Sequence, residues 1–311
     1  MTTTTEQASG ASGDQEGRRR LPDLKALLRS SAGIAVAMAV MNVATYAFQM
    51  ISARLLGPTE YGAVASLMAL LMVVAVLQLG LQATGARRIS AEPEHVGQIE
   101  RMVLRVTYRA ALGLGLLMMA LAPVVHHVLR LDSVVPALLL AVSAVPLTIM
   151  GGQAGVLQGE RRWFSLAGIY LAMGLGRVVV GTACIVVSPT ESAAMLGVMI
   201  AMFAPALVGW LALRRPGLHV RDGDRHSDQH TARRVVTETG SASLALLAFF
   251  VLSNLDIVVA RNVLDDHDAG LYAAGLILTK AVLFLPQFVV VVAFPAMSTP
   301  AQRRRALLRS L

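Results

Sequence analysis

The chain has 311 residues, of which 55% are hydrophobic, and its mean hydropathy is +0.63. This composition excludes an ordinary water-soluble domain, whose surface must be polar, and predicts a membrane protein. A helix of about 20 apolar residues spans a bilayer, and the sequence holds about eight such runs, without the alternation of a membrane β-barrel. We therefore predict an all-α polytopic membrane protein with about eight transmembrane helices.

The positive charge is distributed unevenly along the chain. The net charge is +8, but no basic patch is interleaved with aromatic residues, so a nucleic-acid partner is not expected. Of the 27 Lys and Arg residues, 22 fall in alternate segments on one side of the predicted membrane, and two lie within spans. The other side has three, which are Arg54, Arg130 and Arg261. The positive-inside rule therefore places the N-terminus in the cytoplasm of a multi-pass protein.

The predicted elements follow in chain order. Residues 1–20 are polar and aperiodic, typical of a disordered cytoplasmic tail, and residues 21–30 fit a short interfacial helix. Residues 214–234 form the one long hydrophilic loop, and the single cysteine, Cys184, excludes an internal disulfide. Transmembrane helices are expected at about 31–53, 61–85, 106–128, 133–157, 163–187, 192–213, 236–260 and 269–296.

Part of the sequence repeats. The pair Ala53 and Arg54 ends one apolar run and is followed by a turn and Gly62, and Ala260 and Arg261 are followed in the same way by Gly270. Six predicted helices precede the second copy, so both copies cross the membrane in the same direction, as parallel repeats do. We expect an N-terminal six-helix lobe at 21–213, a cytoplasmic linker at 214–234, and an incomplete C-terminal lobe of two helices at 235–311. The sequence is accordingly expected to be a fragment or a truncated product.

Two cations and one carboxylate lie inside apolar spans. Arg177 and Lys280 are each about 15 Å from either end of their span, and such charges are retained where they face protein or a water-filled cavity. Arg177 shares a helical face with Gly174 and Gly181. Both cations fit a cavity that receives an anionic group, or else structural pairing inside the bundle. Asp256 is shallower and fits the outer mouth of a cavity, ion coupling, or a hydrated boundary position.

Polar side chains form stripes on the first two predicted helices. The first carries Asn42, Thr45, Gln49 and Ser52 at helical spacing, and the second carries Gln78 and Gln82 four residues apart. Such stripes line a cavity or form hydrogen bonds between helices, and the sequence does not choose between the two.

The sequence shows no sign of an enzyme or of a metal site. The loop at 214–234 does not match a calcium-binding loop, and His226 and His230 lack the partners of a zinc site. No phosphate-binding loop or hydrolase motif occurs, and no extramembrane segment is long enough for a catalytic domain. We expect no cofactor, and we expect energy to come from an ion gradient or from the substrate gradient.

Four segments carry a resemblance to a known family. They are ARLLGPTEYGAVASLMALL from Ala53, QLGLQATGARRIS from Gln78, QGERRWFSLAG from Gln158 and NLDIVVARNVLDDHDAGLYAAG from Asn254. These resemble the multidrug/oligosaccharidyl-lipid/polysaccharide exporter superfamily, in its polysaccharide biosynthesis (O-unit flippase-like) branch. The resemblance implies a two-lobed transporter of twelve or more helices that flips lipid-linked sugars outward by alternating access. This chain departs from that pattern by lacking about four helices.

The resemblance implies particular surroundings as well. The expected location is the plasma (inner) membrane, and the expected partners are a lipid-linked glycan substrate, membrane lipids and glycan-assembly membrane proteins. Two alternatives remain open. One is a cation-coupled multidrug exporter of the same superfamily, which predicts a cavity dominated by carboxylates. The other is a non-transporting, truncated membrane subunit.

Overall fold

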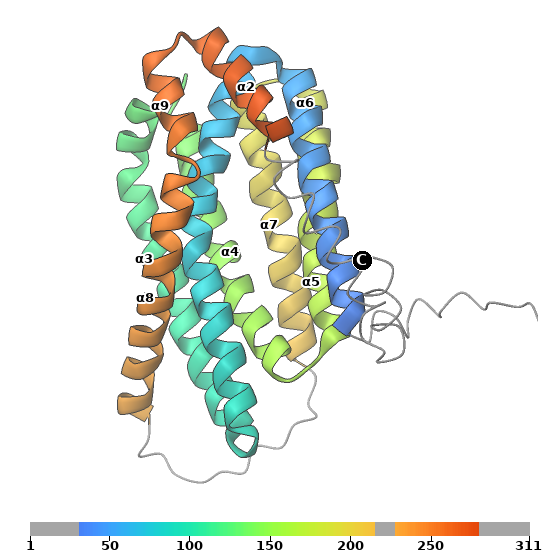
Figure 1. The fold of residues 1–311 in the computed structure, drawn as a ribbon, viewed down its shortest axis with the longest axis vertical. Coiled ribbons are helices and arrows are strands. Elements are labelled where there is room, and N and C mark those ends of the chain that lie inside the picture. Colours follow the sequence, from blue (N-terminus) through green and yellow to red (C-terminus); the bar gives the residue numbers. More distant parts are fainter. Residues whose placement is uncertain (1–30, 215–227, 280–311) are drawn as a thin grey trace, which may run out of the picture.

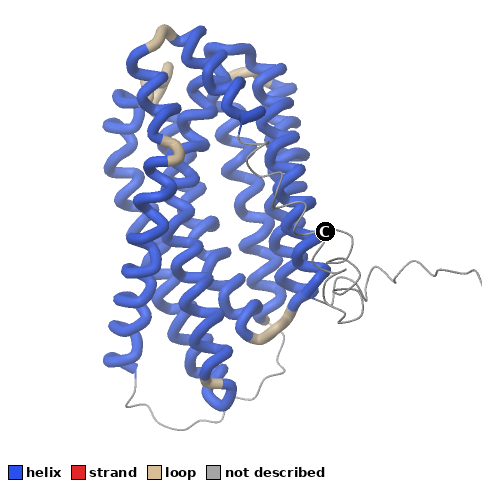
Figure 2. Tube along the Cα trace, viewed as in Figure 1, coloured by secondary structure: helices blue, strands red, loops and turns tan. Residues whose placement is uncertain are grey.

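The computed structural model describes residues 31–214 and 228–279. The predicted tail, the predicted interfacial helix, most of the hydrophilic loop and Lys280 lie outside these residues. The described part is helical, with short turns and without strands (Figures 1 and 2). The prediction of an all-α polytopic membrane protein is thereby confirmed, and the division into two lobes stays a prediction.

The first two predicted helices form a hairpin, α2, which covers Ser31–Ala91. Its legs meet at Gly57, whose φ of 76° and ψ of 172° belong to a region that only glycine adopts readily. Pro58 follows and has no N–H to continue the hydrogen bonds of the first leg. In Figure 1 the two legs, blue and light blue, join at the top of the view and diverge below it. We call the end of the bundle that contains Gly57 the hairpin end.

Replacing Gly57 by Ala is expected to destabilise the protein by about 1–3 kcal/mol, because Ala is strained at this φ and ψ. The cost is purely one of backbone conformation, since a Cβ at Gly57 would meet no atom within 4 Å. Thermal unfolding of the detergent-solubilised protein measures the effect. The matched control is Gly113→Ala, because Gly113 has equally open surroundings within a helix and Ala is favoured there. An equal melting temperature for both variants would contradict the prediction.

Two of the remaining helices, α3 and α8, begin earlier than the sequence predicted. Helix α3 begins at Val96, where the sequence predicted a start near 106, and α8 begins at Asp228 instead of near 236. The early turns of α3 are amphipathic, and Ile99 and Val103 pack against the ends of α2 and α4. The helices after the hairpin are α3 (Val96–Val128), α4 (Val135–Gly159), α5 (Trp163–Gly176), α6 (Thr182–Val187), α7 (Glu191–Leu213), α8 (Asp228–Leu252), α9 (Leu255–Val263) and a further helix at 266–279.

Helix α4 is the centre of the described bundle and packs against α2, α3 and α7. Its residues Gly151, Gly155 and Gly159 follow each other at intervals of four and form one stripe. A Cβ on Gly151 would collide with Gln78, and one on Gly155 would collide with the backbone of Gln82. Small residues at this spacing let two membrane helices approach closely, and here they hold the second leg of the hairpin against α4.

The predicted helix at 163–187 is continuous but not uniform. Helix α5 passes through a π-helical segment at Arg177–Gly181, labelled η2, into α6. π-Helical turns inside α-helices are frequent at functional sites. This π-helical segment begins at Arg177, the buried cation that the sequence predicts as a site residue.

The described residues contain six helices that are long and apolar enough to cross a membrane. The first of these is the hairpin, whose kink at Gly57 divides it into two legs that each have the length of a span. Helices α8 and α9 together make the last of the six, and the helix at 266–279 follows.

Candidate functional site

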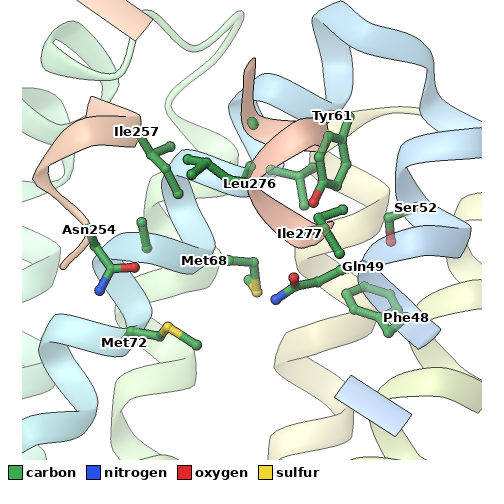
Figure 3. Close-up of a pocket in the computed structure, with 14 residues that line it drawn as sticks. Phe48, Gln49, Ser52, Tyr61, Met68, Met72, Asn254, Ile257, Leu276 and Ile277 are labelled. Carbon is green, nitrogen blue, oxygen red and sulfur yellow. The ribbon is translucent and has the colours of Figure 1, made fainter. Parts of the chain in front are cut away.

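A pocket lies between the two legs of the hairpin and the helix at 266–279 (Figure 3). It contains about 500 Å³ of empty space, counted together with the solvent at its mouth. None of the described residues that line it is charged. They are Phe48, Gln49, Ser52, Tyr61, Val64, Ala65, Met68, Ala69, Met72, Asn254, Ile257, Ala273, Leu276 and Ile277.

A few polar groups are placed among these apolar walls. The Gln49 amide points across the pocket towards Met68 (Figure 3). The hydroxyl of Ser52 is fully buried and has no hydrogen-bond partner within the described chain. A pocket with apolar walls and a small number of hydrogen-bonding groups is typical of sites for organic ligands.

Asn254 reaches the pocket because the chain breaks its helix there. Helix α8 ends at Leu252 and α9 starts at Leu255, and the Asn254 side-chain amide donates to the Phe250 carbonyl oxygen at 2.8 Å. This bond caps the end of α8, whose last carbonyl groups have no partner within the helix. Irregular backbone inside a membrane protein is tolerated where it is buried in protein or lines a cavity.

The predicted pair Gln78 and Gln82 takes part in hydrogen bonds between helices. The Gln78 amide donates to Gln82 Oε1 at 3.1 Å. The Gln82 amide in turn donates to Gln158 Oε1 at 2.9 Å and to the Tyr170 hydroxyl at 2.7 Å. This network joins the second leg of the hairpin to α4 and α5, and neither Gln78 nor Gln82 lines the pocket.

Arg177 is buried in the bundle, with 8% of its surface exposed. Its η2 segment packs against α2 and α7, and its Nη2 approaches the Met202 sulfur at 3.9 Å. Nε has no hydrogen-bond partner, and the ion pairs among described residues do not include Arg177. On the same face, a Cβ on Gly174 would collide with Met41 and one on Gly181 with Phe48. The strip of small residues thus lets the first leg of the hairpin come close to a charge that no described carboxylate neutralises.

The other predicted site residues are dispersed. The carboxylate of Asp256 accepts the Ile257 N–H at 2.9 Å and the Tyr272 hydroxyl at 3.5 Å, and it does not line the pocket. Asn42 is half-buried on the first leg, and Lys280 lies outside the described residues. Among the described residues, Gln49 and Ser52 of the predicted polar stripe line the pocket, and the roles assigned from the sequence stay predictions.

The comparisons with known proteins identify one family and one fold. A family model described as "Polysaccharide biosynthesis protein" matches residues 27–300. No curated protein sequence matches the chain significantly. Among solved structures, the chain resembles an inward-facing multidrug resistance MATE family transporter of the MOP superfamily, with a TM-score of 0.63 and 13% identity. The match covers 85% of this chain and 64% of that transporter, so the chain spans less than two thirds of its length.

Two further structures give the same fold. One is a MATE protein in complex with MaD3S, with a TM-score of 0.61, 14% identity, and coverage of 87% of this chain and 74% of that one. The other is a MOP superfamily transporter from Pyrococcus furiosus, with a TM-score of 0.54, 15% identity, and coverage of 90% and 75%. These similarities give the chain the fold of the MATE and MOP superfamily transporters. The family match over most of its length shows that the chain belongs to the polysaccharide biosynthesis protein family.

Proposed function

We propose that this protein takes part in moving a lipid-linked saccharide precursor across the plasma membrane by alternating access. Its family match concerns polysaccharide biosynthesis, and its fold is that of membrane transporters. A lipid-linked saccharide has a long apolar chain, a phosphate or pyrophosphate and a polar glycan. The path must therefore offer apolar walls, a cation and hydrogen-bonding groups.

The observation that carries this proposal is the unneutralised charge of Arg177. An arginine in the middle of a bilayer costs roughly 2.5–3.5 kcal/mol on insertion scales, and no described carboxylate offsets that cost. A guanidinium group is suited to bidentate contact with a phosphate, whereas it would repel a cationic drug. Arg177 therefore favours an anionic substrate over the cation-coupled multidrug alternative.

The pocket supplies the uncharged part of the path. Both legs of the hairpin and the chain after Asn254 contribute to it, so a movement of either part changes its shape. In the sequence, Lys280 follows the lining residue Ile277 by three residues, and we propose for it a second contact to the anionic group. An exporter of cations would need a carboxylate in the pocket, and no described carboxylate lines it; Asp256 lies outside it and accepts the Tyr272 hydroxyl at 3.5 Å.

The predicted orientation places the hairpin end outside the cell. Three arginines are predicted to lie on the outer side of the membrane. Arg54 lies near the Gly57 kink, Arg130 follows the end of α3, and Arg261 is in the last turn of α9. Residues Arg87, Arg88, Arg161 and Arg162 lie at the opposite ends of the helices. Substrate then moves from the basic end of the bundle towards the hairpin end.

The test is transbilayer movement in vesicles that contain the purified chain. A fluorescent polyprenyl pyrophosphate saccharide is the first probe, and a membrane-permeant cationic dye under a proton gradient is the second. We expect movement of the first probe and none of the second. Movement of the dye alone would overturn the proposal in favour of a multidrug exporter.

A further inference from the structure

Arg261 connects α9 to the end of α3 at the hairpin end of the bundle. Its side chain is buried, with 3% exposed, although the sequence places it near the membrane surface. Nε donates to the Leu129 carbonyl oxygen at 3.1 Å, and Nη2 donates to the Arg130 carbonyl oxygen at 3.0 Å. These carbonyl groups follow the last turn of α3, where the helix dipole favours a cation.

Arg130 makes the same kind of contact in the opposite direction. Its Nη1 donates to the carbonyl oxygens of Arg261 and Leu264, each at 3.2 Å, at the end of α9. Each arginine thus binds the C-terminal carbonyl groups of the other's helix. Asp266 lies between them, with Oδ1 at 3.3 Å from Arg261 Nη1 and at 4.0 Å from Arg130 Nη2. We call Arg130, Arg261 and Asp266 the clasp.

The backbone of Arg130 has a conformation that usually belongs to glycine. Its φ is 48°, and the N–H groups of Arg130 and Leu131 donate to the carbonyl oxygens of His127 and His126. This pattern is a Schellman motif, in which glycine is the usual residue at the position of Arg130. An arginine here costs backbone strain and supplies the guanidinium group of the clasp.

The loop that carries Arg130 is fixed to the hairpin. The Asp132 N–H donates to Glu191 Oε1 at 3.1 Å, and the Glu191 N–H donates to Glu60 Oε2 at 2.6 Å. Beside the clasp, Gly62 packs closely against Gly270. The closeness is shown by a Cβ built on Gly62, which would lie 3.1 Å from the Gly270 Cα and 3.3 Å from Arg261 Nη1. One side of the contact is therefore braced by the hairpin and α7, and the other side belongs to α9 and the helix at 266–279.

The clasp lies next to the pocket along the chain. Tyr61 lines the pocket beside Gly62, and Ala273 lines it one turn after Gly270. We propose that the clasp is the gate that closes the pocket at the hairpin end, and that it separates whenever the pocket opens to that side. This inference rests on the proposed function for the direction of transport, but its test does not depend on the substrate.

The test measures access to the pocket by a thiol reagent. In a Cys184→Ser background, Ala65→Cys places a reporter in the pocket wall, and intact cells are treated with a membrane-impermeant maleimide. Arg130→Gly removes the guanidinium and suits the backbone. It should raise the labelling rate about tenfold or more, because two hydrogen bonds from a charged donor are lost. Asp266→Asn should raise the rate less, and it keeps the size of a side chain that is 43% exposed, so the fold is retained.

Arg161→Gly is the matched control. Arg161 also has a positive φ, 57°, in a Schellman motif, but it lies at the end of α4 and is exposed. Labelling at the wild-type rate in both Arg130→Gly and Asp266→Asn would overturn the gate. Faster labelling from inverted vesicles alone would overturn its placement on the outside. If labelling rises but the lipid-linked probe does not move, the gate stands and the proposed substrate fails. If the lipid-linked probe moves but labelling stays at the wild-type rate, the proposed function stands and the gate fails.

Discussion

Replacing Arg177 by Met is expected to weaken binding of a lipid-linked pyrophosphate saccharide by about ten- to a hundredfold. The reason is the loss of charge-assisted hydrogen bonds to the phosphate groups, each worth about 1.5–3 kcal/mol. The protein should keep its stability or gain some, because Met has a similar length and the buried charge has no described carboxylate partner. Titration of the purified protein with the fluorescent probe measures the binding, and thermal unfolding measures the stability.

Arg109→Met is the control for this substitution, since Arg109 is exposed on α3 and does not line the pocket. It should bind the probe with wild-type affinity. A structural role for Arg177 gives the opposite pattern, in which Arg177→Met lowers the melting temperature and the folded fraction still binds the probe normally. That outcome would remove the cation from the proposed path.

Gly270→Ala is expected to destabilise the hairpin end of the bundle. A Cβ on Gly270 would collide with the carbonyl group of Pro58, and neither backbone can move aside without separating the hairpin from the helix at 266–279. Overpacking of this kind costs about 1–3 kcal/mol. The melting temperature should therefore fall by several degrees, at roughly 2–4 °C per kcal/mol for a chain of this order of size.

Gly275→Ala is its control on the same helix, because a Cβ at Gly275 would meet no atom within 4 Å. This variant should unfold at the wild-type temperature or slightly above it. If Gly270→Ala and Gly275→Ala unfolded alike, the close contact between the hairpin and the helix at 266–279 would be wrong.

The class of fold followed from the sequence because apolar runs of span length leave helices as the simplest solution. The first residues of α3 and α8 could not be predicted from the apolar runs, since both helices begin with polar turns that precede those runs. The first turns of α3 are stabilised by contacts of Ile99 and Val103 that no count of apolar residues detects. The stripe of Gly151, Gly155 and Gly159 is visible in the sequence, and its spacing of four is typical of helices that pack closely in a membrane.

The candidate site was less predictable. A pair such as Gln78 and Gln82 has the same spacing whether it lines a cavity or joins helices, and the outcome depended on Gln158 and Tyr170, far away in the sequence. Tyr61 and Asn254 were missed as pocket residues. Asn254 lines the pocket because of the helix break between Leu252 and Leu255, which nothing in the composition indicates.

One pair of residues at equivalent positions of the predicted repeat is in contact in the structure. Gly62 and Gly270 were paired because each follows an Ala-Arg pair and a turn, and the two glycines pack against each other. Equivalent residues meet in this way where two parallel repeats face each other across an axis along the membrane normal. The contact is what two parallel repeats would give, and the division of the chain into repeats stays a prediction.

The most direct test of the proposed function is the rate at which a fluorescent polyprenyl pyrophosphate saccharide crosses the bilayer of vesicles that contain the protein. Wild type, Arg109→Met and Arg177→Met are compared at equal protein density. We predict that the probe crosses with wild type and Arg109→Met, and that Arg177→Met reduces the rate to near that of empty vesicles. Equal rates for Arg177→Met and wild type would contradict the proposal that this buried cation receives the anionic group of the substrate.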